Sequence, residues 1–351
     1  MRYLLFALCC FVCFVTQSQQ QPTIVEINGL IYSSPIETAE GMVVIASHNS
    51  YVYFFDQNGV LINSYRTGKW VHATPGELAN GDIVIGSYDG YVYFFDRQGN
   101  FQKRINPGGF IFTNPVEIGT YVAFGNNKGQ VVFYCQEKSD FNYLKIGRIV
   151  HGSPMVTNTG NLLIVGSNNK NIHFINSDRE LLHTFETNGW IMHSKPFETA
   201  DGSIIIGSYD RNLYSICPIS GTENWRFTTG GRIHGSPIQT PDGTIIFGSF
   251  DGKIYVLTPC GKLVNQIPTA RRVISSPAMW NESVAFIGSH DGHLYFIDTQ
   301  GILLGKYNTG GRIFSSPITL SNGTVFVATQ NGLLHFLPRQ LIESIIQGQK
   351  K

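Results

Sequence analysis

Charged residues are scarce in this sequence, and neither sign predominates. Of its 351 residues only 14% are Asp, Glu, Lys or Arg, and the formal net charge is +1. An average soluble domain carries roughly 25% charged residues. No long basic run occurs either, so the chain lacks the electrostatic field that draws proteins to nucleic acids or acidic membranes. We therefore expect no nucleic-acid partner.

A hydrophobic run long enough to cross a membrane is also missing. The N-terminal run from Tyr3 to Val15 has no charge but is shorter than the ~18 residues that a membrane span requires. Arg2 precedes it and Thr16-Gln17-Ser18 follows, which is the layout of a secretory signal peptide. Residues 1–18 are thus predicted to be a signal peptide, and the mature protein to be secreted or lumenal, with no membrane span. An uncleaved anchor is the alternative.

Cysteines are few, and half of them lie in the predicted signal. The mature chain keeps an odd number, scattered along the sequence: Cys135, Cys217 and Cys260. A disulfide framework is not expected for a core of this size. A bridge between Cys217 and Cys260 stays open, although equivalent turns of neighbouring repeats usually lie beyond disulfide reach.

What the sequence has in abundance is internal repetition. The stretch from Val71 to Phe110 contains one unit, with turn pairs at Asn80-Gly81 and Asp89-Gly90 between apolar runs of strand length. One unit therefore predicts four antiparallel strands. Its proline recurs at intervals of 39 to 42 residues, at Pro35, Pro75, Pro115, Pro154, Pro196, Pro237, Pro277 and Pro317.

Eight four-stranded units repeating at about 40 residues are typical of a β-propeller. The sequence predicts an all-β fold, a single eight-bladed propeller of four-stranded antiparallel blades over residues 22–338, with a short C-terminal tail at 339–351. The last unit lacks its fourth strand, and residues 22–30 align with a fourth strand that lacks its first three. We therefore expect the N-terminal strand to complete the last blade and close the ring, which removes open sheet edges.

The repeats resemble those of a known family. The segments Ser87–Gly99 (SYDGYVYFFDRQG), Ser249–Gly261 (SFDGKIYVLTPCG) and Ser289–Gly301 (SHDGHLYFIDTQG) are similar to pyrroloquinoline-quinone-like (PQQ-like) propeller repeats, in the WD40/YVTN-like quinoprotein superfamily. The resemblance covers essentially all of the mature chain. Relatives include quinoprotein alcohol dehydrogenases, the propeller lipoprotein of the bacterial outer-membrane assembly machinery, and sensor or scaffold propellers without a cofactor.

The chain departs from the enzymes of that family. Their blade-docking motif, Ala-x-Asp-x-x-x-Gly-x-x-x-Trp, is approached only in the fifth unit, by Ser215, Cys217, Gly221 and Trp225. Their vicinal disulfide has no counterpart, because the one adjacent pair, Cys9-Cys10, lies in the predicted signal. We therefore expect no enzymatic activity and no bound quinone or other cofactor. The alternative is a small-ligand binder or quinone-dependent oxidoreductase that uses the central channel.

The best candidates for a binding site flank the prolines. Residues three before each proline enter the innermost strands and should encircle one mouth of the channel, and bulky residues just before them lie on the loops between blades. Aromatic and Arg side chains are the usual anchors of protein interfaces. The candidate face consists of Tyr32, Trp70, His72, Phe110, Phe112, His151, Trp190, His193, Arg232, His234, Arg272, Arg312 and Phe314.

Other interpretations of these residues stay open. Bulky residues at a repeat position can simply hold neighbouring blades apart. A zinc site from His151, His193 and His234 needs three imidazoles at ~2 Å from one metal, and we expect residues one blade apart around a wide channel not to converge so far. The repeated Asp-Gly pairs, such as Asp89-Gly90, are expected to form turns.

The sequence thus favours a monomeric protein-interaction scaffold that binds protein partners through one axial face. If the protein is made in a eukaryotic secretory pathway, Asn281 and Asn322 are predicted N-glycosylation acceptors, since both stand in Asn-x-Ser/Thr sequons at an exposed turn.

Overall fold

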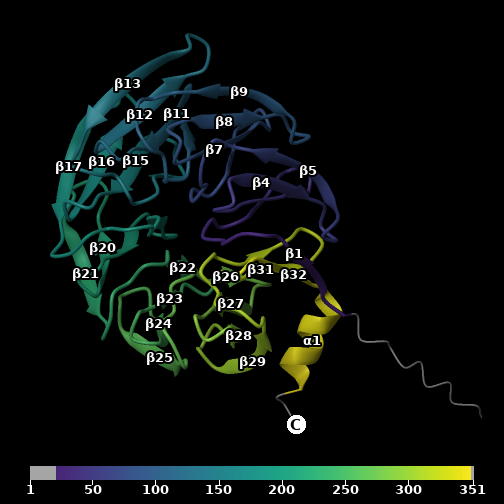
Figure 1. Cartoon of the computed structure of the whole chain (residues 1–351). Coiled ribbons are helices and arrows are strands. Elements are labelled where there is room, and N and C mark those ends of the chain that lie inside the picture. The colour runs from purple at the N-terminus through teal and green to yellow at the C-terminus, as the bar shows by residue number, and fades with distance from the viewer. Residues whose placement is uncertain (1–20, 349–351) are drawn as a thin grey trace, which may run out of the picture.

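The structure is a computed structural model that describes residues 21–348. The predicted signal peptide at 1–18 lies outside the described residues. Eight four-stranded antiparallel sheets stand around a common axis as the blades of a β-propeller (Figure 1). The predicted fold class is therefore confirmed.

Each of the first four blades is one continuous stretch of chain. Its strands run in order from the axis to the rim. Blade one has β2 (Ile36–Glu37), β3 (Val43–Ala46), β4 (Tyr51–Phe55) and β5 (Leu61–Arg66); blade two has β6 (Gly76–Glu77), β7 (Ile83–Gly86), β8 (Val92–Phe95) and β9 (Phe101–Ile105); blade three has β10 (Val116–Ile118), β11 (Tyr121–Gly125), β12 (Gln130–Cys135) and β13 (Asp140–Lys145); blade four has β14 (Met155–Val156), β15 (Leu162–Gly166), β16 (Asn171–Asn176) and β17 (Leu181–Glu186).

The last four blades follow the same order, except that the outermost strand of blade eight is β1. Blade five has β18 (Phe197–Glu198), β19 (Ile204–Gly207), β20 (Asn212–Ile216) and β21 (Glu223–Thr228); blade six has β22 (Ile238–Gln239), β23 (Ile245–Gly248), β24 (Lys253–Leu257) and β25 (Leu263–Pro268); blade seven has β26 (Ala278–Met279), β27 (Val284–Gly288), β28 (His293–Asp298) and β29 (Leu303–Asn308); blade eight has β30 (Ile318–Thr319), β31 (Val325–Ala328), β32 (Leu333–Leu337) and β1 (Thr23–Glu26).

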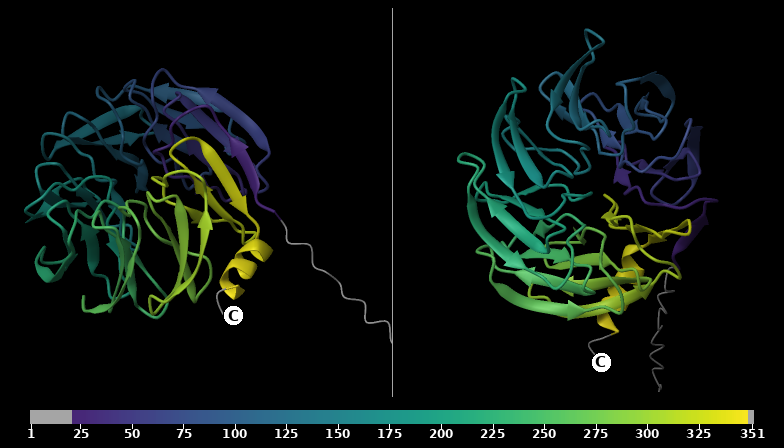
Figure 2. Two further views of the ribbon diagram at one scale, coloured as in Figure 1. Left: turned by 60° about the horizontal axis from the view of Figure 1, so that its bottom comes forward. Right: turned by 60° about the vertical axis from the view of Figure 1, so that its left-hand side comes forward.

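The N-terminal strand closes the ring, as predicted. β1 pairs antiparallel with β32, in a register that sets Thr23 opposite Phe336 and Glu26 opposite Leu333. The two ends of the propeller therefore lie side by side in one sheet (Figures 1 and 2). Pairing β32 on both sides satisfies backbone groups that would otherwise form an open edge.

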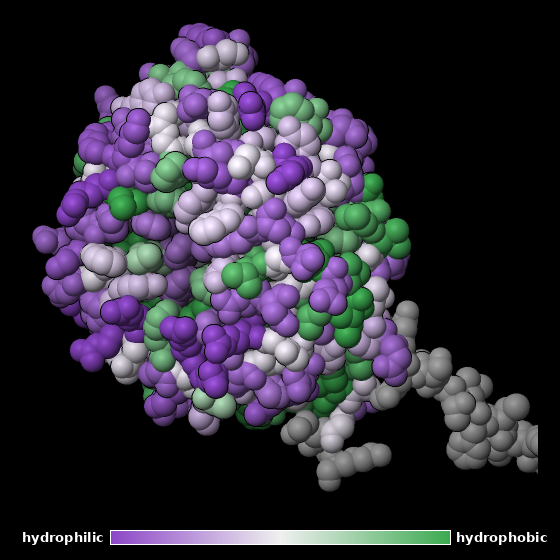
Figure 3. All heavy atoms as spheres, in the orientation of Figure 1, coloured by the Kyte–Doolittle hydropathy of each residue, from purple (hydrophilic) through white to green (hydrophobic). Residues whose placement is uncertain are grey.

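Apolar side chains fill the space between neighbouring blades. Phe54 of blade one and Phe95 of blade two are fully buried and meet edge to face, with ring centroids 5.2 Å apart. Close contact depends on small residues at the ends of the second strands. A Cβ on Gly86 would lie 2.2 Å from Cγ2 of Ile111, which enters the next blade, so only glycine leaves room there. The surface in the orientation of Figure 1 is mostly hydrophilic, with hydrophobic residues in separate small groups (Figure 3).

Polar links also tie the blades together. The Asp of the second hairpin forms its turn, as expected, since Asp89 Oδ1 accepts from the backbone N–H of Tyr91 at 3.0 Å. Its second oxygen does more: Oδ2 accepts from the N–H of Gly68, in the loop arriving from blade one, at 2.8 Å and from the hydroxyl of Tyr93 at 2.6 Å. The same clamp recurs on Asp210, Asp251 and Asp291. These aspartates therefore hold successive blades together.

Two faces of the ring follow from this topology. The loop face carries the second hairpin turns and the loops that cross from one blade to the next. The turn face carries the first and third hairpin turns, including the exposed sequon residues Asn281 and Asn322. Of the three cysteines in the described part of the chain, Cys135 is buried, Cys217 is half-buried and Cys260 is exposed, and all are free. No disulfide joins Cys217 to Cys260.

Near the end of the described residues the chain forms a helix, α1 (Arg339–Gln347), within the residues predicted as a tail. It packs against β29 on the outside of the ring (Figure 2), and its Ile342 is fully buried. Gly305 of β29 permits this approach, because a Cβ there would lie 2.6 Å from Cγ2 of Ile345. In residues 21–348, no helix has the length and hydrophobicity of a membrane span.

Candidate functional site

The residues three before each proline meet at the axis, near the loop face. Tyr32, His72, His193, His234 and Phe314 form a closed circuit of ring contacts, with successive centroids 5.4, 4.9, 4.8, 5.3 and 4.7 Å apart. We call these five residues, together with Phe112 and His151, the axial cluster. Phe112 stacks on His151 at 4.3 Å, and His151 meets His193 edge to face at 5.6 Å. The cluster lies at the axis and does not surround an open mouth.

The expectation of a wide channel was therefore wrong for the part of the axis where the axial cluster lies. His193 owes its position to one extra residue, because Trp190 precedes Pro196 by six positions whereas Trp70 precedes Pro75 by five. His193 adopts φ 61°, a left-handed conformation that non-glycine residues rarely take. This local distortion carries the imidazole of blade five to that of blade two.

Burial keeps the imidazoles of the axial cluster neutral at pH 7. Removal from water, assisted by neighbouring imidazoles, lowers the pKa of His72 to about 3 and holds that of His193 well below 6.5. Burial also lowers the pKa of His151 and His234 to about 4. Nε2 of His72 and Nδ1 of His151 are buried without a hydrogen-bond partner.

The convergence of these imidazoles does not create a metal centre. Among residues 21–348, no three His, Cys, Asp or Glu side chains form a group that could hold a metal ion. The aromatic rings stack and tilt against one another, which favours packing over convergence of their nitrogens on one point. That the protein binds no metal stays a prediction.

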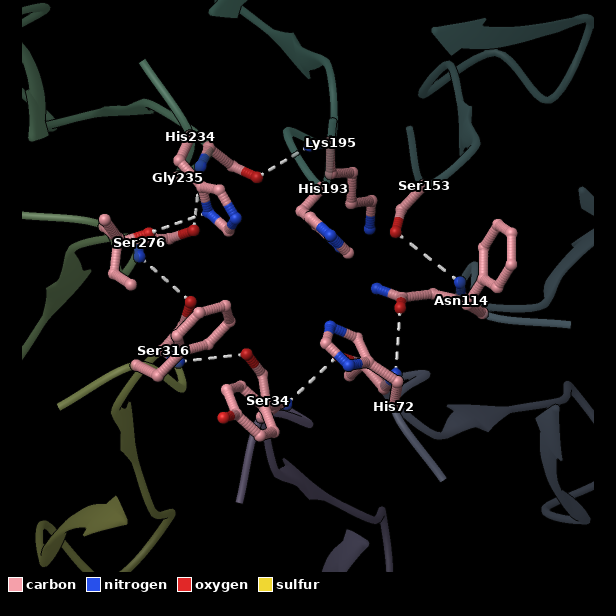
Figure 4. A pocket seen from close by; sticks show the side chains of 16 residues that line it. Ser34, His72, Asn114, Ser153, His193, Lys195, His234, Gly235, Ser276 and Ser316 are labelled. Carbon is pink, nitrogen blue, oxygen red and sulfur yellow. Dashed lines mark hydrogen bonds between the residues drawn. The ribbon is translucent and has the colours of Figure 1, made fainter. Parts of the chain in front are cut away.

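Next to the axial cluster along the axis, a belt of polar residues surrounds the channel. It consists of the residues immediately before the prolines: Ser34, Thr74, Asn114, Ser153, Lys195, Ser236, Ser276 and Ser316. All eight line a cavity of about 290 Å³ together with most of the axial cluster (Figure 4). This belt was not predicted from the sequence, although a small polar residue stands before the proline in seven of the eight repeats.

Aromatic residues of the loops form an exposed group on the loop face. Trp70, Trp190 and Phe110 are 56%, 51% and 42% exposed. Trp70 stacks on His48 at 5.2 Å, and Phe110 stacks on Tyr88 at 6.3 Å. Trp70, Tyr88 and Phe110 line a depression of about 510 Å³ between the first three blades.

Arginines occupy the loops of the later blades. Arg232 lies over the ring of Tyr209 at 5.2 Å, and Arg272 lies over that of Phe250 at 5.4 Å. Arg272 and Arg312 line one depression with Phe250, and Arg271 and His290 complete it. Arg232, Arg271, Arg272 and Arg312 are exposed, and none lies within 4.0 Å of a described carboxylate.

The exposed aromatic residues and arginines of the loops were predicted from the sequence, but the side chains that pack beneath them were not. His48, Tyr88, Tyr209, Phe250 and His290 occupy one repeat position, directly before the Asp or its equivalent in the second hairpin turn. The Asp-Gly pair alone predicts the turn, and the large residue before the Asp carries no signal within a single repeat. Each of these side chains packs against a loop aromatic or Arg.

The docking motif of the quinoprotein enzymes is only partly built. Trp225 Nε1 donates to the carbonyl of Pro259 in blade six at 3.2 Å. Asn63 and Asn265 make the equivalent link, donating to the carbonyls of Gly99 and Gly301 at 2.9 and 3.0 Å. At the position of the motif's Trp, Asn63 and Asn265 thus link neighbouring blades with a side chain shorter than Trp.

Comparisons with known proteins agree with this architecture. The crystal structure of BamB from Moraxella catarrhalis matches with a TM-score of 0.75 at 15% identity, over 90% of this chain and 98% of that one. The computationally designed Ika8 protein matches with a TM-score of 0.76 at 13% identity, over 89% of this chain and 97% of that one. At such identities the likeness shows the fold alone. The curated proteins yield no match.

The family assignment comes from the sequence. The family model for the outer membrane protein assembly factor BamB matches residues 119–340, which is more than half of the chain. The structural match to a BamB propeller covers 90% of the chain and agrees in fold. The chain belongs to the BamB family of PQQ-like repeat propellers.

Proposed function

We propose that this protein is an extracytoplasmic interaction scaffold, without enzymatic activity, whose loop face binds a protein partner. The observation that carries the proposal is that exposed Trp70 and Trp190 share one face with arginines that have no carboxylate partner among the described residues. Large aromatic residues and arginines supply most of the binding energy in protein interfaces.

The arrangement suits an acidic partner surface. Arg232 and Arg272 rest on Tyr209 and Phe250, which limits their conformational freedom. Nε of Arg272 donates to Nδ1 of His290 at 3.1 Å, and the terminal nitrogens of both guanidinium groups stay available for carboxylate contacts. The aromatic depression beside Trp70 offers a place for an apolar anchor of the same partner. Both regions belong to the loop face, so one partner spanning the axis can contact both.

Family membership supports the same function. BamB is by name an assembly factor for outer membrane proteins, and such a role requires binding to other proteins. The predicted signal peptide at residues 1–18 supports a location of the mature chain outside the cytoplasm. The possible glycosylation sites, Asn281 and Asn322, lie on the turn face, where glycans leave the loop face free.

Charge reversal tests the proposal. Arg232→Glu with Arg272→Glu should reduce recovery of the co-purifying partner at least about tenfold, because like charges then face its acidic surface. Lys138→Glu with Lys262→Glu is the matched control, with the same charge change at exposed residues of the turn face. Equal recovery with both double variants, at unchanged melting temperature, would refute the proposed face.

A further inference from the structure

Hydrogen bonds link the polar belt almost completely around the axis. The backbone N–H of a belt residue donates to the side-chain oxygen of the belt residue in the next blade. The recorded bonds run from Ser34 to Thr74 (3.3 Å), Thr74 to Asn114 (3.0 Å), Asn114 to Ser153 (3.5 Å), Lys195 to Ser236 (2.8 Å), Ser236 to Ser276 (2.8 Å), Ser276 to Ser316 (2.9 Å) and Ser316 to Ser34 (2.9 Å).

This pattern leaves the belt rich in donors. A hydroxyl that accepts a hydrogen bond still has its own proton to donate. Within the described chain, no acceptor is recorded for the belt hydroxyls of Ser34, Thr74 or Ser276, nor for those of the other belt serines. Each of these hydroxyl oxygens already accepts one backbone N–H, whereas its own proton is free to donate to a group in the channel.

Lys195 is the exception in the belt and its only charge. It stands where the other blades have Ser, Thr or Asn, and its side chain extends into the channel beside Ser153 and His193 (Figure 4). Of the described residues, no Asp or Glu lines this cavity. Within residues 21–348, no carboxylate lies within 4.0 Å of its ammonium group. The side chain of Lys195 is exposed to the water of the channel, and partial removal from water by the surrounding protein lowers the pKa of its ammonium group from the ordinary value.

We propose that the channel binds a small oxyanion, a phosphate or carboxylate group, held by the Lys195 ammonium group and the hydroxyl protons of the polar belt. A cation, a ring of donors and the absence of carboxylates are the features that select an anion. The cavity of about 290 Å³ has room for such a group. The axial cluster crosses the axis on the loop-face side of the belt, so the anion enters from the turn face.

This site is separate from the proposed partner face. The anion contacts Lys195 and the belt, whereas the partner contacts the loops that carry Trp70, Arg232 and Arg272. Loss of one binding event should therefore leave the other intact.

Calorimetric titration of the mature protein with inorganic phosphate, sulfate and citrate tests the proposal. At least one of these should bind saturably to the native chain. Lys195→Ser should weaken that binding by about tenfold or more, since a charged hydrogen bond is lost. Serine is the belt residue of five other blades and offers an acceptor to the backbone N–H of Ser153 in the preceding blade, so this variant should fold at least as stably. Lys195→Arg should retain binding.

Each outcome decides the proposal. Equal affinity of the native chain and Lys195→Ser would show adventitious anion binding and overturn it, as would the absence of saturable binding to all three anions. Lys262→Ser, at an exposed lysine of the turn face, controls for the lost positive charge. Arg232→Glu with Arg272→Glu should bind the anion normally.

Discussion

The imidazole of His72 in blade two lies 4.9 Å from that of His193 in blade five, measured between ring centroids. This contact reaches across the ring and not between neighbours, so the axial cluster links non-adjacent blades. A propeller normally depends on contacts between adjacent repeats. Here the axis adds a further connection, made of neutral imidazoles and aromatic rings.

Stability should fall as the pH falls from about 7 toward 4. The pKa of His234 is about 4 in the folded protein and near 6.5 when unfolded, so between these values the unfolded chain binds more protons. The stabilisation is complete above pH 6.5 and is lost as the pH approaches 4. His234 alone should cost roughly 2 kcal/mol at pH 5. Urea unfolding at pH 7 and pH 5 measures the loss.

Replacing an axial histidine should reduce this pH dependence. His72→Phe places at this position the residue found in blades three and eight, where Phe112 and Phe314 already belong to the cluster. The difference in unfolding free energy between pH 7 and pH 5 should become smaller than in the native chain. His183→Phe, on the outer strand β17, is the control for removing a histidine outside the axial cluster. An identical pH profile for His72→Phe would contradict burial of a neutral imidazole.

The aspartate clamps should act as coupled units. Asp251 accepts from the hydroxyl of Tyr255 at 2.6 Å and from the N–H of Gly230 at 2.8 Å, so removing its carboxylate leaves both donors without a partner. Asp251→Ala should cost about 2–3 kcal/mol and Tyr255→Phe about 1 kcal/mol. Because the residues contact each other, the double variant should cost less than the sum. Strict additivity in chemical unfolding would refute the clamp.

Removal of the N-terminal strand should open the ring. Deletion of residues 22–30 exposes β32, which pairs with β1 along Leu333–Phe336. An open apolar edge both destabilises the last blade and invites association. We expect a melting temperature lower by several degrees and a concentration-dependent increase in size by light scattering. A monomeric variant with an unchanged melting temperature would contradict closure by β1.

Gly305 should be required for docking of α1. In Gly305→Val the new side chain meets Ile345 and displaces the helix from β29, which exposes Ile342. The expected cost is about 2–4 kcal/mol, comparable to loss of a buried large apolar side chain. The same substitution in a chain ending at Pro338 should cost much less, since no helix remains to be displaced. A similar cost in the full chain and in the chain ending at Pro338 would show that Gly305→Val does not act through displacement of α1.

The repeating features of the fold could be predicted because each follows from local chemistry. Asp89-Gly90 and its counterparts specify hairpins, and the spacing of Pro35, Pro75 and the later prolines fixes the blade length. The unmatched strand at residues 22–30 could complete a sheet only in blade eight. Each of these inferences required nothing beyond a comparison of one repeat with another.

The arrangement at the axis could not be predicted, because it depends on how eight repeats converge. The sequence shows that His72 and His193 occupy equivalent positions, but it does not show that their side chains touch. Their contact arises from one additional residue before His193 and from its φ of 61°. Lys195 likewise has no special meaning within a single repeat. Its isolation is apparent only when the other belt residues are seen to be uncharged.

The central claim, that the loop face binds a protein partner, is tested most directly by photo-crosslinking in the native host. A photoreactive amino acid would replace Trp70 or Trp190 on the loop face and, as controls, Lys138 or Lys262 on the turn face. We predict that both loop-face positions capture the same partner, that capture is lost with Arg232→Glu and Arg272→Glu, and that neither control captures it. Capture of a partner from the turn-face positions alone would contradict the account.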